Sequence, residues 1–219
     1  MEAVQSSWAH LEAKSAQSGP QEIPPELRGK VFSWEEVKKN IENNRLEVFR
    51  RKPEDRVVYK AWCKDRIEEY GSITAYMCAK RLQWTPLEDS SAETGPLFDA
   101  CDPTPFADPR DYKILRNDWP YGSFEPGITH LIVWSKSRIP LDGETGLVTP
   151  GSRQLIEDFV QRTFVARLER EGPGAGEKVV WYKNWAALQS VPGLEHFHVL
   201  VKDVQESILV EWAGDALQL

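Results

Sequence analysis

Residues 128–136 read ITHLIVWSK, a short run in which β-branched and aromatic side chains dominate. Such side chains favour extended backbone, because they pack well on a pleated surface. Similar runs follow at 178–185 (KVVWYKNW), 195–203 (EHFHVLVKD) and 206–214 (ESILVEWAG). Because turn residues separate the runs, the C-terminal half is predicted to form a largely antiparallel sheet.

The segment between the first two runs has a helical period instead. Pro150 suits a first helical turn. The apolar residues after it recur at helical spacing, namely Leu155, Phe159, Val160, Phe164 and Leu168. This stripe predicts a helix of about twenty residues that covers one face of the sheet.

The N-terminal half is predicted to be helical. Ser33-Trp34-Glu35-Glu36 has the spacing of a capping box, which starts a helix over about 34–44. Pro53 begins a second helix, which Gly71 ends, and Ser72 caps a third. The apolar stripe expected on the second helix contains Val57, Val58, Ala61, Trp62, Ile67 and Tyr70.

Two segments lack a regular period. Residues 1–27 are polar and are predicted to form a mobile arm, and residues 85–111 form a long irregular connection rich in Pro, Ser and Asp. We therefore predict an α+β fold in a single domain over residues 28–219. A helical part, 28–84, precedes the connection, and a mainly antiparallel sheet with a long covering helix, 112–219, follows it.

The composition and the motifs exclude several classes of protein. The 219 residues are 41% hydrophobic, and no apolar run approaches the ~18 residues of a membrane span. The N-terminus lacks a signal-peptide pattern, and the three cysteines lack C-x-x-C spacing, so a cytoplasmic protein without disulfides is expected. Motifs for phosphate loops, dinucleotide binding, zincins and nucleophile elbows are missing from the sequence, and we expect neither a metal nor a cofactor.

Basic residues are concentrated in one part of an acidic chain. The net charge is -7, yet residues 28–66 hold twelve Lys and Arg against seven Asp and Glu, a local balance of +5. The local field rather than the total charge steers a polyanion. The segment is therefore a candidate phosphate-binding face, the alternative being a solvated helical surface of mixed charge.

His196 and His198 lie two residues apart on a predicted strand, so their side chains share one face. His130 has a similar place on an earlier strand, and on neighbouring strands the three converge. With a carboxylate they would hold a metal, although no compact carboxylate spacing accompanies them. One imidazole would otherwise act as a general base or attack an acyl or phosphoryl group, and the simplest alternative is a hydrogen-bonded core histidine.

The stretch Asn117-Asp118-Trp119-Pro120-Tyr121-Gly122 is a second candidate site. Its residue types suit a structural turn. A carboxylate beside aromatic rings, as in Asp118 with Trp119 and Tyr121, also suits a guanidinium, which can be paired and stacked at once.

Three blocks together resemble one family. They are YKAWCKDRIEEYGSITAYMCAKRLQW (59–84), NDWPYG (117–122) with ITHLIVWSK, and NWAALQSVPGLEHFHVLVKD (184–203). The chain resembles the fungal N-acetylglucosamine-induced proteins over about residues 30–203. That family includes arginine-containing cyclodipeptide synthases, which join arginine to a second amino acid as a diketopiperazine. The resemblance implies arginyl-tRNA and a second aminoacyl-tRNA as partners.

The resemblance also implies roles for residues of this chain. The catalytic candidates, for a base and for oxyanion donors, are His196, His198, His130, Tyr121 and Asn117. The substrate-binding candidates are Asp118, Trp119, Asp102, Trp134 and Trp185. The candidates for contacts with tRNA phosphates are Lys38, Lys39, Arg50, Arg51, Lys52, Arg56 and Lys60. Direct transfer with His196 as the base and covalent transfer through an acyl-imidazole both remain open.

Two other functions are compatible with the sequence. HLIVWSK, a helix and then QSVPGLEHFHVLV resemble the layout of histidine-triad nucleotide hydrolases and transferases, with Leu194 where the first triad histidine would stand. The third possibility is a non-catalytic protein that binds a metabolite.

Overall fold

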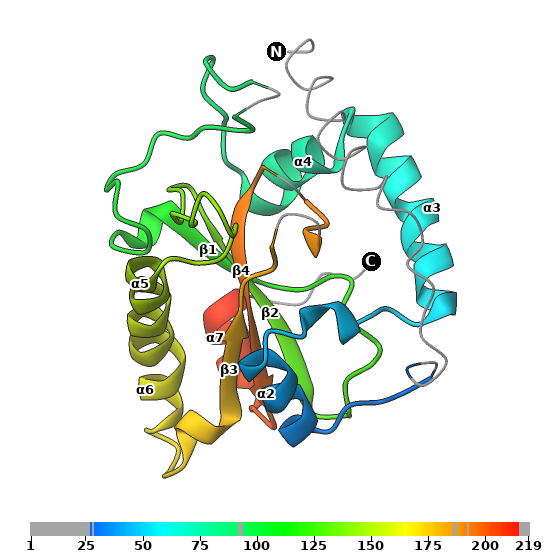
Figure 1. Ribbon diagram of the computed structural model, residues 1–219. Coiled ribbons are helices and arrows are strands. Elements are labelled where there is room, and N and C mark those ends of the chain that lie inside the picture. The colour runs from blue at the N-terminus through cyan, green and yellow to red at the C-terminus, as the bar shows by residue number, and fades with distance from the viewer. Residues whose placement is uncertain (1–26, 28, 92–93, 186–187, 192, 215–219) are drawn as a thin grey trace.

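A four-stranded antiparallel sheet in the order β1-β2-β4-β3 lies at the centre of the computed structural model (Figure 1). The strands are β1 (Tyr112–Arg116), β2 (Ile128–Ser135), β3 (Val179–Tyr182) and β4 (Glu195–Lys202). The structure describes residues 27, 29–91, 94–185, 188–191 and 193–214. All but Leu27 of the predicted N-terminal arm lies outside them. The predicted α+β class is confirmed.

One face of the sheet carries the main hydrophobic core. The covering helix starts at α5 (Pro150–Val160) and continues through the π-helical segment η5 (Gln161–Val165) into α6 (Ala166–Leu168), beside α7 (Glu206–Ala213). Fully buried side chains of this helix and of the sheet form the core, among them Ile156, Phe159, Phe164, Leu131, Phe197 and Val199. The long covering helix predicted from the apolar stripe is thus confirmed.

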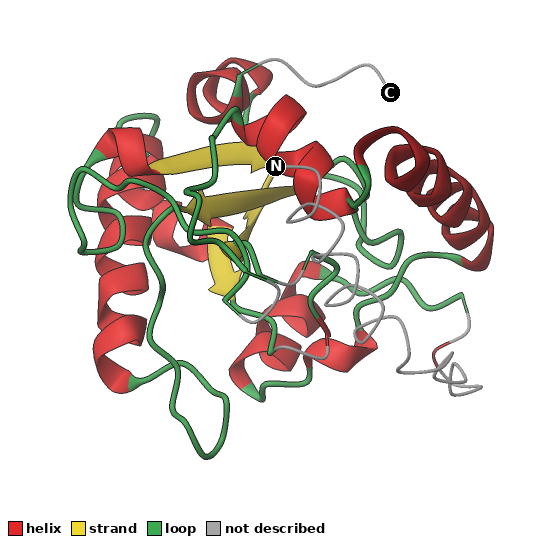
Figure 2. Ribbon diagram, turned by 90° about the horizontal axis from the view of Figure 1, so that it is seen from above, coloured by secondary structure: helices red, strands yellow, loops and turns green. Residues whose placement is uncertain are grey.

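The other face is covered by the N-terminal helices, so the sheet lies between two groups of helices (Figure 2). These are α2 (Trp34–Glu42), η2 (Leu46–Val48), α3 (Pro53–Tyr70), α4 (Ile73–Tyr76) and η3 (Met77–Leu82), with the short turns η4 (Pro109–Asp111) and η6 (Ala175–Lys178) elsewhere. The predicted capping box is present, because Ser33 and Glu36 each accept the other's backbone N–H. None of the helices in the described residues combines the length and the hydropathy needed to cross a membrane.

Two predictions about the C-terminal half were wrong. The run 206–214 is the helix α7 rather than a strand. Asp203, at φ 49°, turns the chain out of β4, and Ile208 and Trp212 then lie one helical turn apart against the core. The strand β1 was missed, because two of its five residues, Lys113 and Arg116, are charged and hide the alternating pattern.

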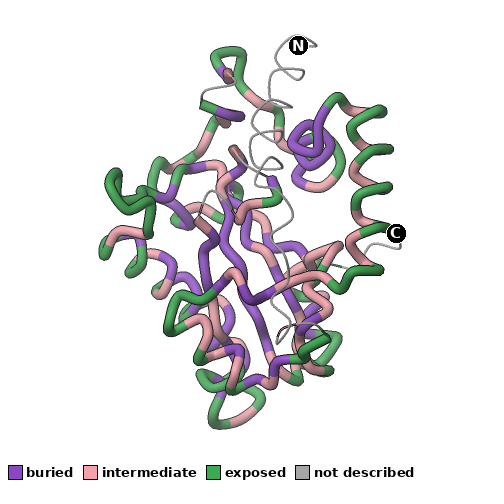
Figure 3. Tube along the Cα trace, turned by 45° about the vertical axis from the view of Figure 1, so that its right-hand side comes forward, coloured by how far each residue is buried: buried purple, intermediate pink, exposed green. Residues whose placement is uncertain are grey.

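The side of α3 that faces the rest of the protein is not the side predicted from its aliphatic residues. Val57 is 70% and Val58 58% exposed, and no residue of α3 is fully buried (Figure 3). Aromatic rings make the inward contacts instead: Trp62 packs on Tyr76 of α4 at a centroid distance of 5.3 Å and on Tyr59 at 6.2 Å. The helix therefore covers the sheet through rings that also line a pocket.

Candidate functional site

The three histidines of the sheet share the face that carries the N-terminal helices. In the register of β2 and β4, Trp134 lies opposite His196 and Ile132 opposite His198. His130 lies two residues before Ile132, and cross-strand partners point to the same side. The structure thus brings together the three histidines that the sequence placed on one face.

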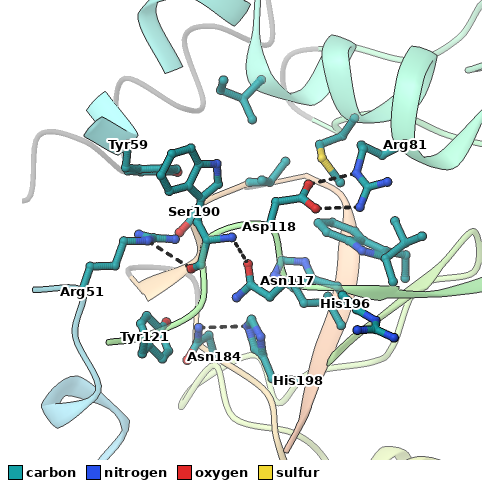
Figure 4. Close-up of a pocket in the computed structure, with 18 of the residues that line it drawn as sticks. Arg51, Tyr59, Arg81, Asn117, Asp118, Tyr121, Asn184, Ser190, His196 and His198 are labelled. Atoms are coloured by element: carbon teal, nitrogen blue, oxygen red, sulfur yellow. Dashed lines mark hydrogen bonds and ion pairs between the residues drawn. The ribbon is translucent and has the colours of Figure 1, made fainter. Parts of the chain in front are cut away.

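A pocket opens on this face, with about 650 Å³ of empty space including its mouth (Figure 4). Its walls come from α3, α4, η3, the strands β1, β2 and β4, and the segments after β1 and β3. Lining residues that the sequence had singled out include His196, His198, Trp134, Trp119, Tyr121 and Arg51.

The Asn117 amide sets the direction of a hydrogen-bond chain beside the pocket. Its Oδ1 accepts the backbone N–H of Trp119 at 3.0 Å, so its Nδ2 faces His130 Nδ1 at 3.1 Å. An amide NH₂ can only donate, so the neutral His130 ring carries its hydrogen on Nε2 and donates it to His198 Nδ1 at 2.8 Å. Asn117 therefore orients His130 with one of its two amide hydrogens, and the oxyanion role predicted for Asn117 stays a prediction.

His198 is the second member of this chain. Its Nδ1 lone pair accepts the hydrogen from His130, so its own hydrogen is on Nε2, which lies 3.2 Å from the Asn184 amide. Asn184 Nδ2 is the amide atom placed nearest to His198 Nε2. Rotating the amide by 180° exchanges Nδ2 and Oδ1, so that Oδ1 accepts the hydrogen of His198 Nε2. Because its lone pair is used inside the protein, His198 is a poor base for a substrate.

His196 has the opposite arrangement. Its Nδ1 lies 2.8 Å from the carbonyl oxygen of Leu194, which can only accept, so the ring carries its hydrogen there and its lone pair on Nε2. No described residue forms a hydrogen bond with Nε2. The ring packs against Trp134 at a centroid distance of 4.6 Å and lines the pocket. Burial, aided by the nearby Lys183 ammonium, lowers the pKa of His196 to about 4, so the imidazole is neutral at pH 7.

The free energy of unfolding is expected to fall as the pH drops from 7 to 5.5. Burial lowers the pKa of His130 to about 3, that of His196 to about 4, and that of His198 well below its usual value. Below about pH 6.5 these histidines therefore bind protons in the unfolded chain but not in the folded chain. Between pH 7 and 5.5 this difference lowers the free energy of unfolding by about 1 kcal/mol per histidine. Urea unfolding at the two pH values measures the loss, which should be smaller in His130→Gln. Equal stability of the wild type at both would contradict the neutral, buried state.

Asp118 holds a guanidinium, but one of this chain. Arg81 Nε and Nη2 donate to the two oxygens of Asp118 at 2.9 and 2.7 Å, and the two side chains are 11% and 13% exposed. Burial raises the pKa of Asp118, against the opposing effect of Arg81. The carboxylate predicted to select arginine is therefore already paired in the free protein.

Arg51 brings a positive charge to the pocket. Its Nε donates to the Trp119 carbonyl at 3.3 Å, and its guanidinium lies 4.0 Å from the centre of the Tyr59 ring. Among the described residues no carboxylate forms an ion pair with Arg51. The charge also contributes to the lowered pKa of His130 and His198.

Several predicted site residues lie elsewhere. The Asp102 carboxylate accepts the Thr104 N–H at 2.7 Å and does not line the pocket, and Trp185 lines a different cavity. Lys38 forms ion pairs with Glu35 and Glu177 on α2 and η6. These placements remove Asp102 and Trp185 from the candidate substrate site.

The described residues contain one group with the spacing of a metal site. Cys101, Asp108 and Asp111 offer ligand atoms within 4.8 Å of one another. Both carboxylates already have cationic partners, because Arg110 pairs with Asp108 at 2.6 Å and Lys136 with Asp111 at 3.1 Å. Both carboxylates are therefore satisfied internally, and none of the three residues lines the pocket.

The sequence did not single out several polar residues of the pocket, among them Tyr59, Arg81 and Asn184. Tyr59 and Arg81 lie in the block 59–84, and Asn184 follows β3. Arg81 pairs with Asp118, 37 residues away, and Asn184 contacts His198, 14 residues away, so no local motif reports these contacts. The usable signal was the asparagine near the end of the predicted strand 178–185.

Comparisons with known proteins place this chain in a family. The family described as "Protein of unknown function (DUF3605)" matches residues 33–202. The chain is 32% identical over 194 residues to N-acetylglucosamine-induced protein 1 of Candida albicans, covering 84% of this chain and 73% of that protein. It is 29% identical over 179 residues to an uncharacterized protein of Saccharomyces cerevisiae, covering 78% of each.

One solved structure is also similar. The structure named "Crystal Structure of HTC1" has a TM-score of 0.62 and 27% identity, and the match covers 83% of this chain and 90% of that chain. The resemblance to N-acetylglucosamine-induced proteins is confirmed, and the synthase activity stays a prediction.

Proposed function

The chain belongs to the DUF3605 family, and from the geometry of its pocket we propose that it is an aminoacyl-tRNA-dependent cyclodipeptide synthase that joins arginine to a second amino acid. The observation that carries this proposal is His196. Its neutral ring keeps a lone pair on Nε2, in a pocket that α3 helps to line and that also contains Arg51, a cation with no ion-pair partner among the described residues.

In this proposal, His196 moves the proton in each acyl transfer. The neutral α-amine of one aminoacyl group attacks the ester carbonyl of the other, and Nε2 takes a proton from the attacking nitrogen as the new bond forms. The C–O bond to the tRNA ribose breaks, and His196 returns the proton to the departing oxygen. The amine of the dipeptidyl ester then attacks its own ester in the same way and closes the ring. A covalent route, in which Nε2 attacks the ester to form an acyl-imidazole, uses the same lone pair.

The aromatic rings of the pocket support binding of the arginine side chain. Tyr59, Trp62 and Trp119 form a cluster with centroid distances of 5.4 to 6.2 Å. This aromatic cluster already holds the guanidinium of Arg51 over Tyr59. Flat cations stack well on such rings, and the Asp118 carboxylate lines the same pocket.

The tRNA backbone is proposed to follow α3. Lys52, Arg56, Lys60 and Lys64 recur every four residues and so lie along one side of the helix. Lys52, Lys60 and Lys64 are exposed. Arg51, which precedes Lys52 in the sequence, lines the same pocket as His196. In this proposal it adds one more positive charge between the row of side chains on α3 and His196.

Reversing charges on α3 should weaken tRNA binding. The double variant Lys60→Glu, Lys64→Glu removes two phosphate contacts, so the affinity should fall broadly and the slope of log K against log salt should decrease by about 2. The matched control is Arg170→Glu, Lys178→Glu, which makes the same charge change at exposed residues beyond α6 and in η6, across the sheet from α3 in Figure 1. Equal salt slopes in the two double variants would place the tRNA elsewhere.

The proposed function is tested by incubating the protein with tRNA, ATP, arginine, a mixture of amino acids and their synthetases, with mass spectrometry as the readout. An arginine-containing cyclic dipeptide that disappears after ribonuclease treatment supports it. Turnover of free nucleotides without tRNA would instead favour a histidine-triad-like enzyme. Stabilisation by a small metabolite without any product would favour a binding protein.

A further inference from the structure

The pocket concentrates buried hydrogen-bond donors that have no acceptor. Four buried side-chain polar atoms in the described residues lack a partner: Arg66 Nε, Arg116 Nε, Trp119 Nε1 and Trp134 Nε1. Two of these residues, Trp119 and Trp134, line the pocket with their side chains, whereas the guanidinium of Arg116 donates through its other nitrogens to Glu206 of α7 on the opposite face of the sheet. A buried donor without an acceptor lowers the stability of the fold. Their grouping at one pocket indicates a ligand that supplies acceptor oxygens.

Two indole N–H groups on other parts of the described chain have acceptors. Trp34 Nε1 donates to the Glu177 carbonyl at 2.7 Å, and Trp181 Nε1 donates to the Glu157 carboxylate at 2.7 Å. The missing partners of Trp119 and Trp134 are therefore a feature of the pocket rather than of tryptophan in this fold.

Trp134 is the one of these donors that adjoins the proposed base. It lies opposite His196 in the pairing of β2 with β4, and the two rings are in contact at a centroid distance of 4.6 Å, tilted by 33°. Its side chain is 3% exposed. A lone pair on His196 Nε2 and a free N–H on Trp134 therefore belong to two rings in contact in one pocket wall.

We propose that the Trp134 indole N–H binds the carbonyl oxygen of the reacting ester and stabilises the oxyanion that forms there, an inference that rests on the proposed function. His196 removes a proton from the amine, the amine bonds to the ester carbon, and the carbonyl electrons move to the oxygen that Trp134 holds. The shielding of this N–H from water strengthens the bond to a developing negative charge. Met77, which packs in the same cluster, has an unbranched side chain that can turn aside for the ligand oxygen.

The test replaces Trp134 by β-(3-benzothienyl)alanine through site-specific incorporation. This side chain keeps the shape of the indole and its contact with His196 but has sulfur in place of N–H. The melting temperature should equal or exceed that of the wild type, because an unpaired buried donor has been removed. The rate of cyclic dipeptide formation should fall at least tenfold, with little change in KM, because the lost bond is strongest in the transition state.

The matched control is the same replacement at Trp181, whose N–H has a partner outside the pocket. It should lower the melting temperature and leave the rate unchanged. A rate equal to that of the wild type in the Trp134 variant, or a fall in its melting temperature as large as that of the Trp181 variant, would overturn the proposal. Absence of cyclic dipeptide with the wild type itself would overturn the proposed function, and the role of Trp134 with it.

Discussion

Replacing His196 by alanine is expected to lower the rate of cyclic dipeptide formation by about 10²-fold or more, while tRNA binding persists. His196 is the histidine whose lone pair is left on the pocket side, because its Nδ1–H is fixed by the Leu194 carbonyl. Single-turnover kinetics with preformed aminoacyl-tRNAs measures this rate apart from binding.

A matched variant separates the base from its scaffold. His196→Asn keeps an N–H donor for the Leu194 carbonyl but has no basic lone pair, so it should be as inactive as the alanine variant and more stable. His198→Ala should retain more activity and lose more stability, because His198 joins His130 to Asn184. Full turnover by a folded His196→Ala protein would show that this imidazole is structural.

The second large effect is expected at Asp118. The Arg81 side chain is 11% exposed in the wild-type structure. Changing Asp118 to asparagine leaves the buried guanidinium of Arg81 without its negatively charged partner. Breaking one partner of such a buried pair costs about 3 kcal/mol or more of unfolding free energy. Urea unfolding measures the loss, and catalysis should be assayed only under conditions in which the variant is folded.

A double-mutant cycle gives the control. In Asp118→Asn, Arg81→Met the unpaired charge is gone, so most of the lost stability should return. If Asp118→Asn loses arginine incorporation and the double variant regains it, Asp118 supports the pocket through its ion pair with Arg81. If the double variant is stable but incorporates no arginine, Asp118 contacts the substrate. Asp118→Asn with the stability of the wild type would contradict the account of this ion pair.

Local patterns predicted much of the fold. The capping box at Ser33, the terminator Gly71 and the stripe after Pro150 each act within a few residues, so the sequence reports them directly. The run 206–214 failed because a short apolar segment suits a strand and a buried helix equally. The aliphatic residues of α3 predicted the wrong inward side, because that side is built of aromatic rings that line a pocket.

The site was predicted in part. The shared face of His196 and His198 follows from the two-residue period of a strand. Which of the two histidines keeps a free lone pair depends on partners distant in sequence. These partners are His130, 68 residues from His198, and the side-chain amides of Asn117 and Asn184 at the two ends of the hydrogen-bond chain. The pairing of Asp118 with Arg81, 37 residues away, likewise leaves no trace in a local motif.

Cyclic dipeptide formation in this pocket is tested with two purified aminoacyl-tRNAs, one carrying labelled arginine, in the absence of synthetases and ATP. The wild type is expected to move the label from tRNA into a cyclic dipeptide, and His196→Asn is expected to leave it on the tRNA. Label that stays on the tRNA with the wild type, or is released only as free arginine, would contradict the claim that this pocket joins two aminoacyl groups.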